Sequence, residues 1–231
     1  MRLTPRLQAI ADKVPPGSIV ADIGSDHAYI PVYLLVNRLV SHVIVSDDRE
    51  GPLQAARDTL ALFNVGKAAD LRLGDGLSVI QPQDKVDTIV LAGMGGETIC
   101  SVIDRGHGIL ASGTRLVLQA MTDTSMVRAW LVDNGYSLTQ EDIAQEGNSF
   151  YEIVVAQRNG KSQTFDPRLL AVGPLLVSQR HPLLQPMLEQ RLMRLRRAAV
   201  NVRKSSSQAA KERGKLLKAR IDSLEEVLSW L

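Results

Sequence analysis

Residues 18–31 combine the pattern of a buried strand with a glycine turn and a helix start, which restricts the fold more than any composition value. Apolar residues dominate from Ile19 to Ile23, with an acid at Asp22, and Gly24 then precedes short polar residues. This pattern is typical of a parallel strand buried on both faces and followed by a tight turn. Because open α/β sheets bind ligands at the carboxyl ends of their strands, the stretch predicts a first strand with its ligand loop.

Strand-like and helix-like segments alternate along the first 157 residues. Strand patterns occupy residues 19–23, 41–47, 69–73, 86–92, 115–119, 136–138 and 150–156. Helix patterns occupy residues 5–11, 30–40, 51–63, 97–104 and 124–134. The alternation predicts an α/β fold with a mostly parallel, doubly wound sheet, in which the last two strands form an antiparallel edge.

The polar segment 160–166 interrupts this alternation, so we expect one domain over residues 1–160 and a second over residues 161–231. Beyond the interruption, apolar residues recur in steps of three and four, as in the seams of coiled coils. The two series are Leu184, Leu188, Leu192, Leu195, Ala199 and Val202, then Leu217, Ile221, Leu224, Leu228 and Leu231. A serine run at residues 205–207 separates them, which predicts an antiparallel helical, coiled-coil hairpin.

The net charge of +2 hides an uneven distribution of charge along the chain. Residues 1–157 carry 12 Lys and Arg against 19 Asp and Glu, whereas residues 158–231 carry 15 against 6. An acidic body with a basic tail indicates a polyanionic partner bound by the tail, although a solvated basic helix face would give the same count.

Other features exclude whole classes of protein. Hydrophobic residues at 45% supply a core, so global disorder is not expected. The chain has no apolar run near ~20 residues and no signal-peptide core at its start, so we expect a cytoplasmic protein without membrane contact. Scattered histidines and the single Cys100, which we expect to be a buried hydrophobe, make no metal site. A monomer is the expected state.

The chemistry at the strand ends indicates which cofactor fits. A dinucleotide site requires Gly-x-Gly-x-x-Gly, whereas this loop contains only Gly24, and a Walker phosphate motif is absent. S-adenosylmethionine instead needs partners for an amino-acid end, a ribose diol and an adenine. Acids, glycines and one methionine at four successive strand ends fit those needs: Asp22, Gly24, Asp47, Asp48, Asp75, Gly76, Gly93, Met94 and Gly95.

Each of these strand ends has an expected role. Gly24 lets the backbone approach the methionine moiety, and Asp22 holds its ammonium or organises the loop. Asp47 accepts from the ribose hydroxyls, and Asp75 accepts from the adenine amino group. A lone Asp at a strand end is often only a helix cap, and the glycines at 93–96 can be a simple tight turn. Four such ends in succession favour a methyltransferase-type site.

Several stretches resemble the bacterial TrmK family, the tRNA adenine-22 N1-methyltransferases. The resemblance rests on Ala21-Asp22-Ile23-Gly24-Ser25-Asp26-His27-Ala28-Tyr29-Ile30-Pro31, Glu50-Gly51-Pro52-Leu53-Gln54-Ala55-Ala56, Gly74-Asp75-Gly76-Leu77 and Asp87-Thr88-Ile89-Val90-Leu91-Ala92-Gly93-Met94-Gly95-Gly96. It covers the whole catalytic domain, including residues 150–154, and extends in character to the basic tail. It implies a class I Rossmann-like methyltransferase fold, S-adenosylmethionine as donor and tRNA as substrate.

Two positions depart from the family pattern. Members often carry Gln-Pro-Asn where this chain has Gln119-Ala120-Met121, and usually have Glu at the position of Asp47. The first departure lies on the expected substrate side. The second shortens a side chain and keeps its charge.

The expected reaction needs alignment more than chemical activation. The N1 lone pair of adenine is nucleophilic, the sulfonium donor is already activated, and a paired adenine must be flipped out to expose N1. We expect Asp26, His27, Tyr29, Met94 and Gln119 to line the pocket. Asp26 accepts from the exocyclic amine, Tyr29 stacks on the base and His27 bonds the base or the loop; helix capping and core packing remain the alternatives.

The basic tail is expected to contact RNA phosphates, because folded RNA is recognised largely through its backbone shape. The candidate substrate residues there are Arg191, Arg194, Arg197, Arg203 and Lys204. A tRNA methyltransferase accounts for both halves of the chain. A small-molecule methyltransferase leaves the basic arm without a role, and a non-catalytic nucleic-acid-binding or coiled-coil module accounts for the tail alone.

Overall fold

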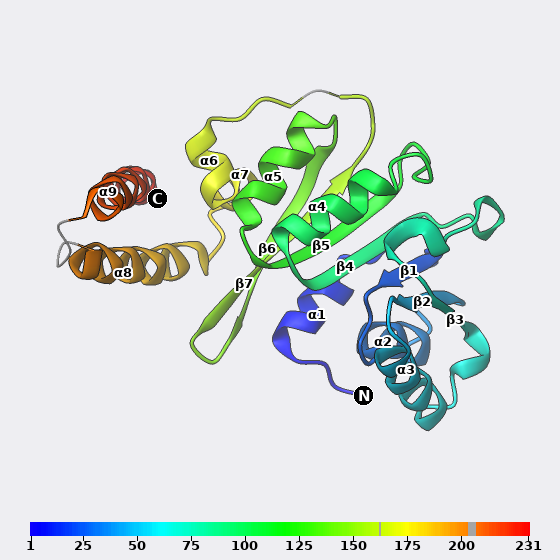
Figure 1. The fold of residues 1–231 in the computed structure, drawn as a ribbon. Coiled ribbons are helices and arrows are strands. Elements are labelled where there is room, and N and C mark those ends of the chain that lie inside the picture. The colour runs from blue at the N-terminus through cyan, green and yellow to red at the C-terminus, as the bar shows by residue number, and fades with distance from the viewer. Residues whose placement is uncertain (162, 203–206) are drawn as a thin grey trace. The chain divides into compact units, whose positions relative to one another are not determined.

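The computed structural model describes residues 1–161, 163–202 and 207–231. Its chain divides into two compact units, Met1–Thr164 and Phe165–Leu231, which are described separately. Figure 1 shows the strands of the first unit and the long helices of the second.

The first unit is built on one seven-stranded sheet of order β3-β2-β1-β4-β5-β7-β6 within the described residues. Its strands are β1 (Val20–Ile23), β2 (Val43–Asp47), β3 (Ala69–Leu73), β4 (Thr88–Gly95), β5 (Arg115–Thr122), β6 (Ser137–Glu146) and β7 (Ser149–Gln157). Neighbouring strands from β3 to β5 pair in parallel, while β7 pairs antiparallel with β5 and with β6. The predicted mostly parallel sheet with an antiparallel edge is confirmed.

Helices cover both faces of this sheet (Figure 1). They are α1 (Pro5–Ala11), α2 (Tyr29–Val36), α3 (Glu50–Leu62), α4 (Gly96–Arg105) and α5 (Thr124–Asp133), with short 3₁₀ turns η1 (Gly66–Ala68), η2 (Gly76–Val79) and η3 (Pro82–Asp84). Helices α1, α2 and α3 share one aliphatic cluster with the strands, while α4 and α5 pack on each other. The central strands β1 and β2 are buried at every position, and most of their residues are apolar because both faces of these strands are covered.

The register brings the carboxyl ends of four strands to one edge of the sheet. Ile23 at the end of β1 pairs with Ser46 on β2 and with Leu91 on β4. Asp47 at the end of β2 pairs with Leu73 at the end of β3. The residues that follow these four strands therefore share one edge, which is where open α/β sheets bind their ligands.

Several strands are longer than their sequence patterns predicted, and β4 and β6 are the two that bear on the site and on the sheet edge. β4 runs to Gly95, beyond the predicted end at residue 92, and its pairing with β5 shifts register around Met94. β6 covers Ser137–Glu146, although only residues 136–138 carry a strand pattern. The polar residues of β6 beyond residue 138 still pair with β7 along the strand. Tertiary pairing therefore overrides their weak local preference for strand structure.

The second unit is helical in its described residues. It contains α6 (Pro167–Val172), α7 (Pro174–Ser178), α8 (Leu184–Val202) and α9 (Gln208–Leu228), and α8 contacts α9. The apolar series is buried at Leu184, Leu188 and Leu192 on α8, and at Leu217 and Leu224 on α9. No helix in the described part of the chain is long and apolar enough to cross a membrane.

Candidate active site

The loop after β1 forms the centre of the shared edge. Asp22 is buried near the end of β1, and loss of water raises its pKa to about 6, despite a hydrogen bond with Ser25. Gly24 has a φ of +72°, and its backbone N–H donates to the Ser46 carbonyl at 2.7 Å. A side chain at Gly24 would be strained and would collide with Cε of Met94, so glycine is required for the close approach.

The end of β2 carries two adjacent acids in different surroundings. Asp47 is buried and accepts a 3.0 Å hydrogen bond from the backbone N–H of Arg49. Burial raises the pKa of Asp47, and the Arg49 N–H partly offsets that rise. Asp48 is exposed, with its Oδ1 3.5 Å from Nε of Arg49. Asp47 is therefore the better placed of the two to accept hydrogen bonds inside a site.

The acid after β3 already has a cationic partner. Both oxygens of Asp75 accept from the Arg105 guanidinium of α4, at 2.6 and 3.1 Å, across a sequence separation of 30 residues. Both side chains are more than half exposed, so the pair is open to solvent. Gly76 follows with a φ of +56° and opens η2. Any ligand that uses the Asp75 carboxylate must compete with Arg105.

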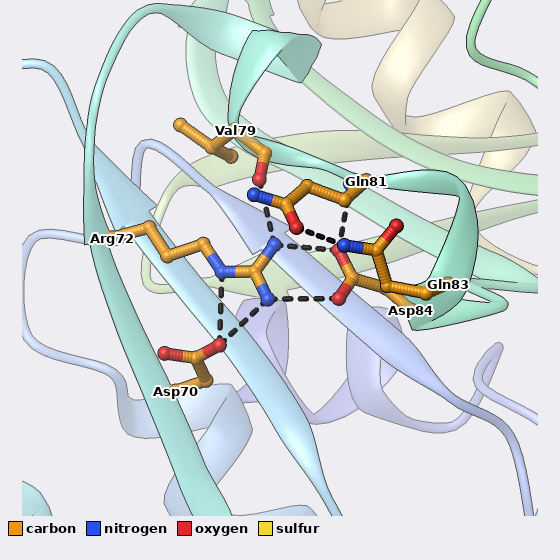
Figure 2. A network of polar contacts seen from close by, with 6 residues as sticks. All are labelled: Asp70, Arg72, Val79, Gln81, Gln83 and Asp84. Atoms are coloured by element: carbon orange, nitrogen blue, oxygen red, sulfur yellow. Dashed lines mark hydrogen bonds and ion pairs between the residues drawn. The ribbon is translucent and has the colours of Figure 1, made fainter.

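A network of hydrogen bonds and ion pairs around the partly buried Arg72 holds the segment that carries Asp75. Figure 2 shows the Arg72 guanidinium of β3 between the carboxylates of Asp70 and Asp84. The same guanidinium donates to the Val79 carbonyl at 2.7 Å, and the Arg72 hydrogen bonds hold the pKa of Asp84 below its usual range. These contacts connect β3 with the ends of η2 and η3. They therefore fix both ends of the segment in which Asp75 lies.

The glycines at the end of β4 serve two purposes. Gly93 has a φ of +78° beside the bulge, and Met94 reaches back to Gly24 on the neighbouring strand end. A Cβ on Gly95 would find ordinary contacts, whereas a Cβ on Gly96 would lie 2.9 Å from the carbonyl oxygens of Thr122 and Asp123. Gly96 is therefore explained by packing between α4 and the end of β5.

The three candidate catalytic residues lie together before and at the start of α2. The rings of His27 and Tyr29 are stacked with centroids 5.2 Å apart, and Nε2 of His27 lies 3.5 Å from Oδ2 of Asp26. All three side chains are substantially exposed. The N-cap of α2 is Ala28, in the left-handed region with a φ of +52°, so Asp26 is not the cap of this helix.

Gln119 lies at the end of β5 and is completely buried. Its Oε1 accepts from Nη1 of Arg6 at 2.9 Å, and its Nε2 donates to the Ala120 carbonyl at 2.8 Å. Sequence reasoning placed Gln119 at the substrate and missed Arg6. The following Ala120 is buried and Met121 is half exposed, so only the second of these two positions lies at the surface of this edge.

The arrangement fits S-adenosylmethionine as its ligand. A desolvated carboxylate at Asp22 suits an ammonium, and the Gly24 loop admits a close backbone approach. The Asp47 and Asp75 carboxylates lie at the ends of the next two strands of the sheet, β2 and β3, where each can accept hydrogen bonds. No group of three or more His, Cys, Asp or Glu suited to a metal occurs among residues 1–161, 163–202 and 207–231.

The predicted tail residues have different surroundings. Arg194 and Arg197 are exposed on α8, three positions apart, and so lie on one side of the helix. Arg191 is half-buried and donates to the Ala171 carbonyl at 3.2 Å. Arg203 and Lys204 lie outside the described residues.

Two functional-site neighbours escaped sequence reasoning, Arg105 and Arg6. Each meets its partner across at least 30 residues of sequence, at Asp75 and at Gln119. No local motif marks either arginine. Only the packing of α1 and α4 on the sheet brings these two arginines to the shared edge.

Comparison with known proteins gives consistent matches over nearly the whole chain. The model of a family described as TrmK, tRNA (adenine(22)-N(1))-methyltransferase, matches residues 20–226. The tRNA (adenine(22)-N(1))-methyltransferase of Bacillus subtilis (strain 168) is 32% identical over 237 residues, which cover 99% of this chain and 98% of that protein.

Solved structures show the same similarity. An uncharacterized protein from Listeria monocytogenes serotype 4b is 30% identical with a TM-score of 0.91, covering 98% of this chain and 100% of that one. A Streptococcus pneumoniae protein solved in complex with S-adenosyl-L-methionine is also 30% identical, with a TM-score of 0.87 and coverage of 98% and 100%.

Proposed function

The chain belongs to the TrmK family of tRNA (adenine(22)-N(1))-methyltransferases, and from this membership we propose which of its residues bind the methyl donor and which meet the target adenine. The enzyme transfers the methyl group of S-adenosylmethionine to N1 of adenine-22 in tRNA. The observation that carries the residue assignment is the meeting of four strand ends at one edge, with Asp22, Gly24, Asp47 and Asp75 in order along it.

The donor is bound along this edge with its amino-acid end at β1. Asp22 accepts from the donor ammonium, Asp47 from the ribose hydroxyls and Asp75 from the adenine amino group; Asp48 and Gly76 border those sites. Gly93, Met94 and Gly95 form the wall between the donor and the target base. When bound, the donor supplies an activated methyl group, so the protein has to position the base and exclude water.

The test of the function is methyl transfer from labelled S-adenosylmethionine to unmodified tRNA. Label recovered as N1-methyladenosine at position 22 supports the proposal, and loss of label in a tRNA with guanine at that position controls for specificity. Label found only in small molecules would favour a small-molecule methyltransferase. Cofactor binding without turnover on any RNA would favour a non-catalytic module.

Asp26 is the residue that we expect to act on the base. As N1 gains a methyl group, positive charge develops on the adenine, and a carboxylate near the exocyclic amine stabilises it. Tyr29, stacked with His27 and exposed, offers a face on which the flipped base stacks.

Replacing Asp26 with alanine should reduce kcat about 10- to 100-fold, as expected for loss of one electrostatic contact in the transition state. The dissociation constant for S-adenosylhomocysteine should stay within about twofold of wild type, measured by calorimetry, because that ligand does not use Asp26. Asp58→Ala on α3 is the control. Wild-type turnover in Asp26→Ala would remove this residue from the mechanism.

Replacing Arg105 with alanine should tighten cofactor binding by about two- to fivefold, since the solvent-exposed pair with Asp75 contributes little and competes with the ligand. Calorimetry with S-adenosylmethionine measures the effect. Asp75→Ala should weaken binding in the same assay. If Arg105→Ala weakens binding instead, Arg105 contacts the donor directly and does not compete with it.

The second unit is proposed to bind tRNA phosphates through Arg194 and Arg197, with Arg191 and the undescribed Arg203 and Lys204 as further candidates. The double variant Arg194→Glu/Arg197→Glu should weaken tRNA binding by about tenfold or more. The slope of log affinity against log salt should fall by the equivalent of about two phosphate contacts. The charge-matched control is Arg57→Glu/Lys67→Glu in the first unit. Equal losses in both double variants would mean that net charge alone, and not this surface, binds the RNA.

Two general assignments complete the proposal. A cytoplasmic location agrees with a tRNA substrate, and a monomer is the expected state. Sedimentation of the full chain, with and without tRNA, measures the latter.

A further inference from the structure

The guanidinium of Arg6 lies at the carboxyl ends of β4 and β5, on the edge that holds the candidate site. Its Nη1 donates to Oε1 of Gln119 at 2.9 Å. A Cβ on Gly93 would lie 3.7 Å from the same nitrogen. Gly93 adjoins Met94, whose side chain reaches Gly24, so Arg6 is next to the wall between donor and base.

Contacts from three elements hold this arginine in place. Its backbone N–H donates to Oε1 of Glu146 at 2.7 Å, which fixes the start of α1 on the end of β6. Its Cζ lies 5.4 Å from the ring centroid of Tyr151 on β7, within the range of a cation–π contact. The buried Gln119 amide donates to the Ala120 carbonyl, so its oxygen is oriented toward Arg6.

The positive charge of Arg6 is only weakly compensated. Among the described residues, no carboxylate lies within ion-pair distance of its guanidinium, and its side-chain contacts are a neutral amide and a ring. The charge of Arg6 does influence the carboxyl of Glu146. Burial raises the pKa of that carboxyl, but hydrogen bonds from Thr4 and the Arg6 backbone N–H, together with the Arg6 charge, bring it below its usual range.

A guanidinium has five N–H donors in a planar fork that matches the geometry of carboxylate and phosphate oxygens. One donor meets Gln119, and the residue is only partly buried, so other N–H donors remain available to a ligand. A positive charge beside an adenine that becomes cationic would oppose the reaction unless an anion balances it.

We propose that Arg6 is an oxyanion-binding residue of the active site, oriented by Gln119 and Tyr151. The inference rests on the proposed function. Its ligand is one of two oxyanions that the reaction brings to this edge, the carboxylate at the amino-acid end of the donor or a phosphate next to the target nucleotide. In either case the bound anion neutralises Arg6 before charge develops on the base.

The test replaces Arg6 with glutamine, which has a similar helix propensity and leaves the backbone contact with Glu146 intact. The dissociation constants of S-adenosylhomocysteine and its decarboxylated analogue are measured by calorimetry, and the KM for tRNA is measured in steady state. A loss of about tenfold or more for S-adenosylhomocysteine alone assigns the carboxylate. A similar rise in the KM for tRNA, with unchanged cofactor affinity, assigns the phosphate.

Three controls make the outcome decisive. Arg57→Gln removes an exposed arginine from α3 and should change none of these values, while Arg6→Lys should recover part of the lost affinity because it keeps the charge without the fork. If Arg6→Gln keeps both affinities and kcat within twofold, Arg6 only attaches α1 to β5 and the proposal is wrong. Methylation of position 22 by the wild type tests the proposed function separately.

Discussion

Replacing Asp22 with asparagine is expected to weaken S-adenosylmethionine binding about 100-fold or more, because the donor ammonium loses its carboxylate partner inside a desolvated site. Asparagine has nearly the same shape, so Gly24 and its loop should remain in place. Since the pKa of Asp22 is about 6, wild-type affinity should also fall as the pH drops below 6, and the asparagine variant should lack that dependence.

The same substitution should stabilise the folded protein. The pKa of Asp22 rises from 3.8 to about 6 on folding, so its protonated form is favoured in the native state. The stability that this group contributes is fully present below pH 3.8 and is lost as the pH rises through about 6. Asparagine avoids this loss, so the free energy of unfolding at pH 8 should rise by up to about 3 kcal/mol.

Urea unfolding at pH 5 and pH 8 and calorimetry with S-adenosylmethionine measure these two effects. Asp58→Asn removes an exposed carboxylate from α3 and should change neither value appreciably. A destabilised Asp22→Asn variant at pH 8 would show that the carboxylate organises the loop through its charge. Unchanged cofactor affinity would refute the assignment of Asp22 to the donor.

Replacing Arg128 with methionine is expected to destabilise the first unit by about 3–5 kcal/mol, because two buried carboxylates lose their common partner. Arg128 of α5 is fully buried and bonds Glu141 of β6 and Glu152 of β7, the latter at 2.7 Å. The attraction of both glutamates outweighs the effect of desolvation and raises the pKa of the guanidinium. The network attaches α5 to the antiparallel edge of the sheet.

Thermal unfolding measures the effect as a fall in Tm of about 10 °C or more. Replacing all three residues with methionine should recover much of the loss, since no charge is then left buried without a partner. Arg57→Met, at an exposed position, should lower Tm little. A mild effect of Arg128→Met would mean that water or a local rearrangement compensates the two glutamates.

The alternation of short apolar runs with helix patterns was sufficient to predict the mostly parallel sheet and the edge that its strand ends share. Asp22, Gly24, Asp47 and Asp75 are each adjacent to the end of such a run, so the order of strands brings them together. The family resemblance is confirmed by the comparisons. These features are local in sequence, and a buried parallel strand leaves a clear apolar signal.

The features that sequence did not reveal depend on distant partners. β6 contains polar residues such as Gln140 and Asp142, so its sequence carries no strand pattern there. The strand forms because β7 pairs with it. Gln119 was expected to meet the substrate, but its buried amide accepts a hydrogen bond from Arg6. That contact depends on where α1 packs, which the sequence around Gln119 does not reveal. The contact between Arg105 and Asp75 likewise arises from the packing of α4.

The shift of register within β4 limits how this site can change during evolution. β4 stays paired with β5 past the bulge, through Met94 and Ala120 to Gly95 and Thr122, immediately before α4 begins. An insertion or deletion in this stretch would displace α4 and every contact that follows, unlike a length change in a surface loop. New substrate contacts at this edge should therefore arise by side-chain exchange on a fixed backbone, for example at the half-exposed Met121.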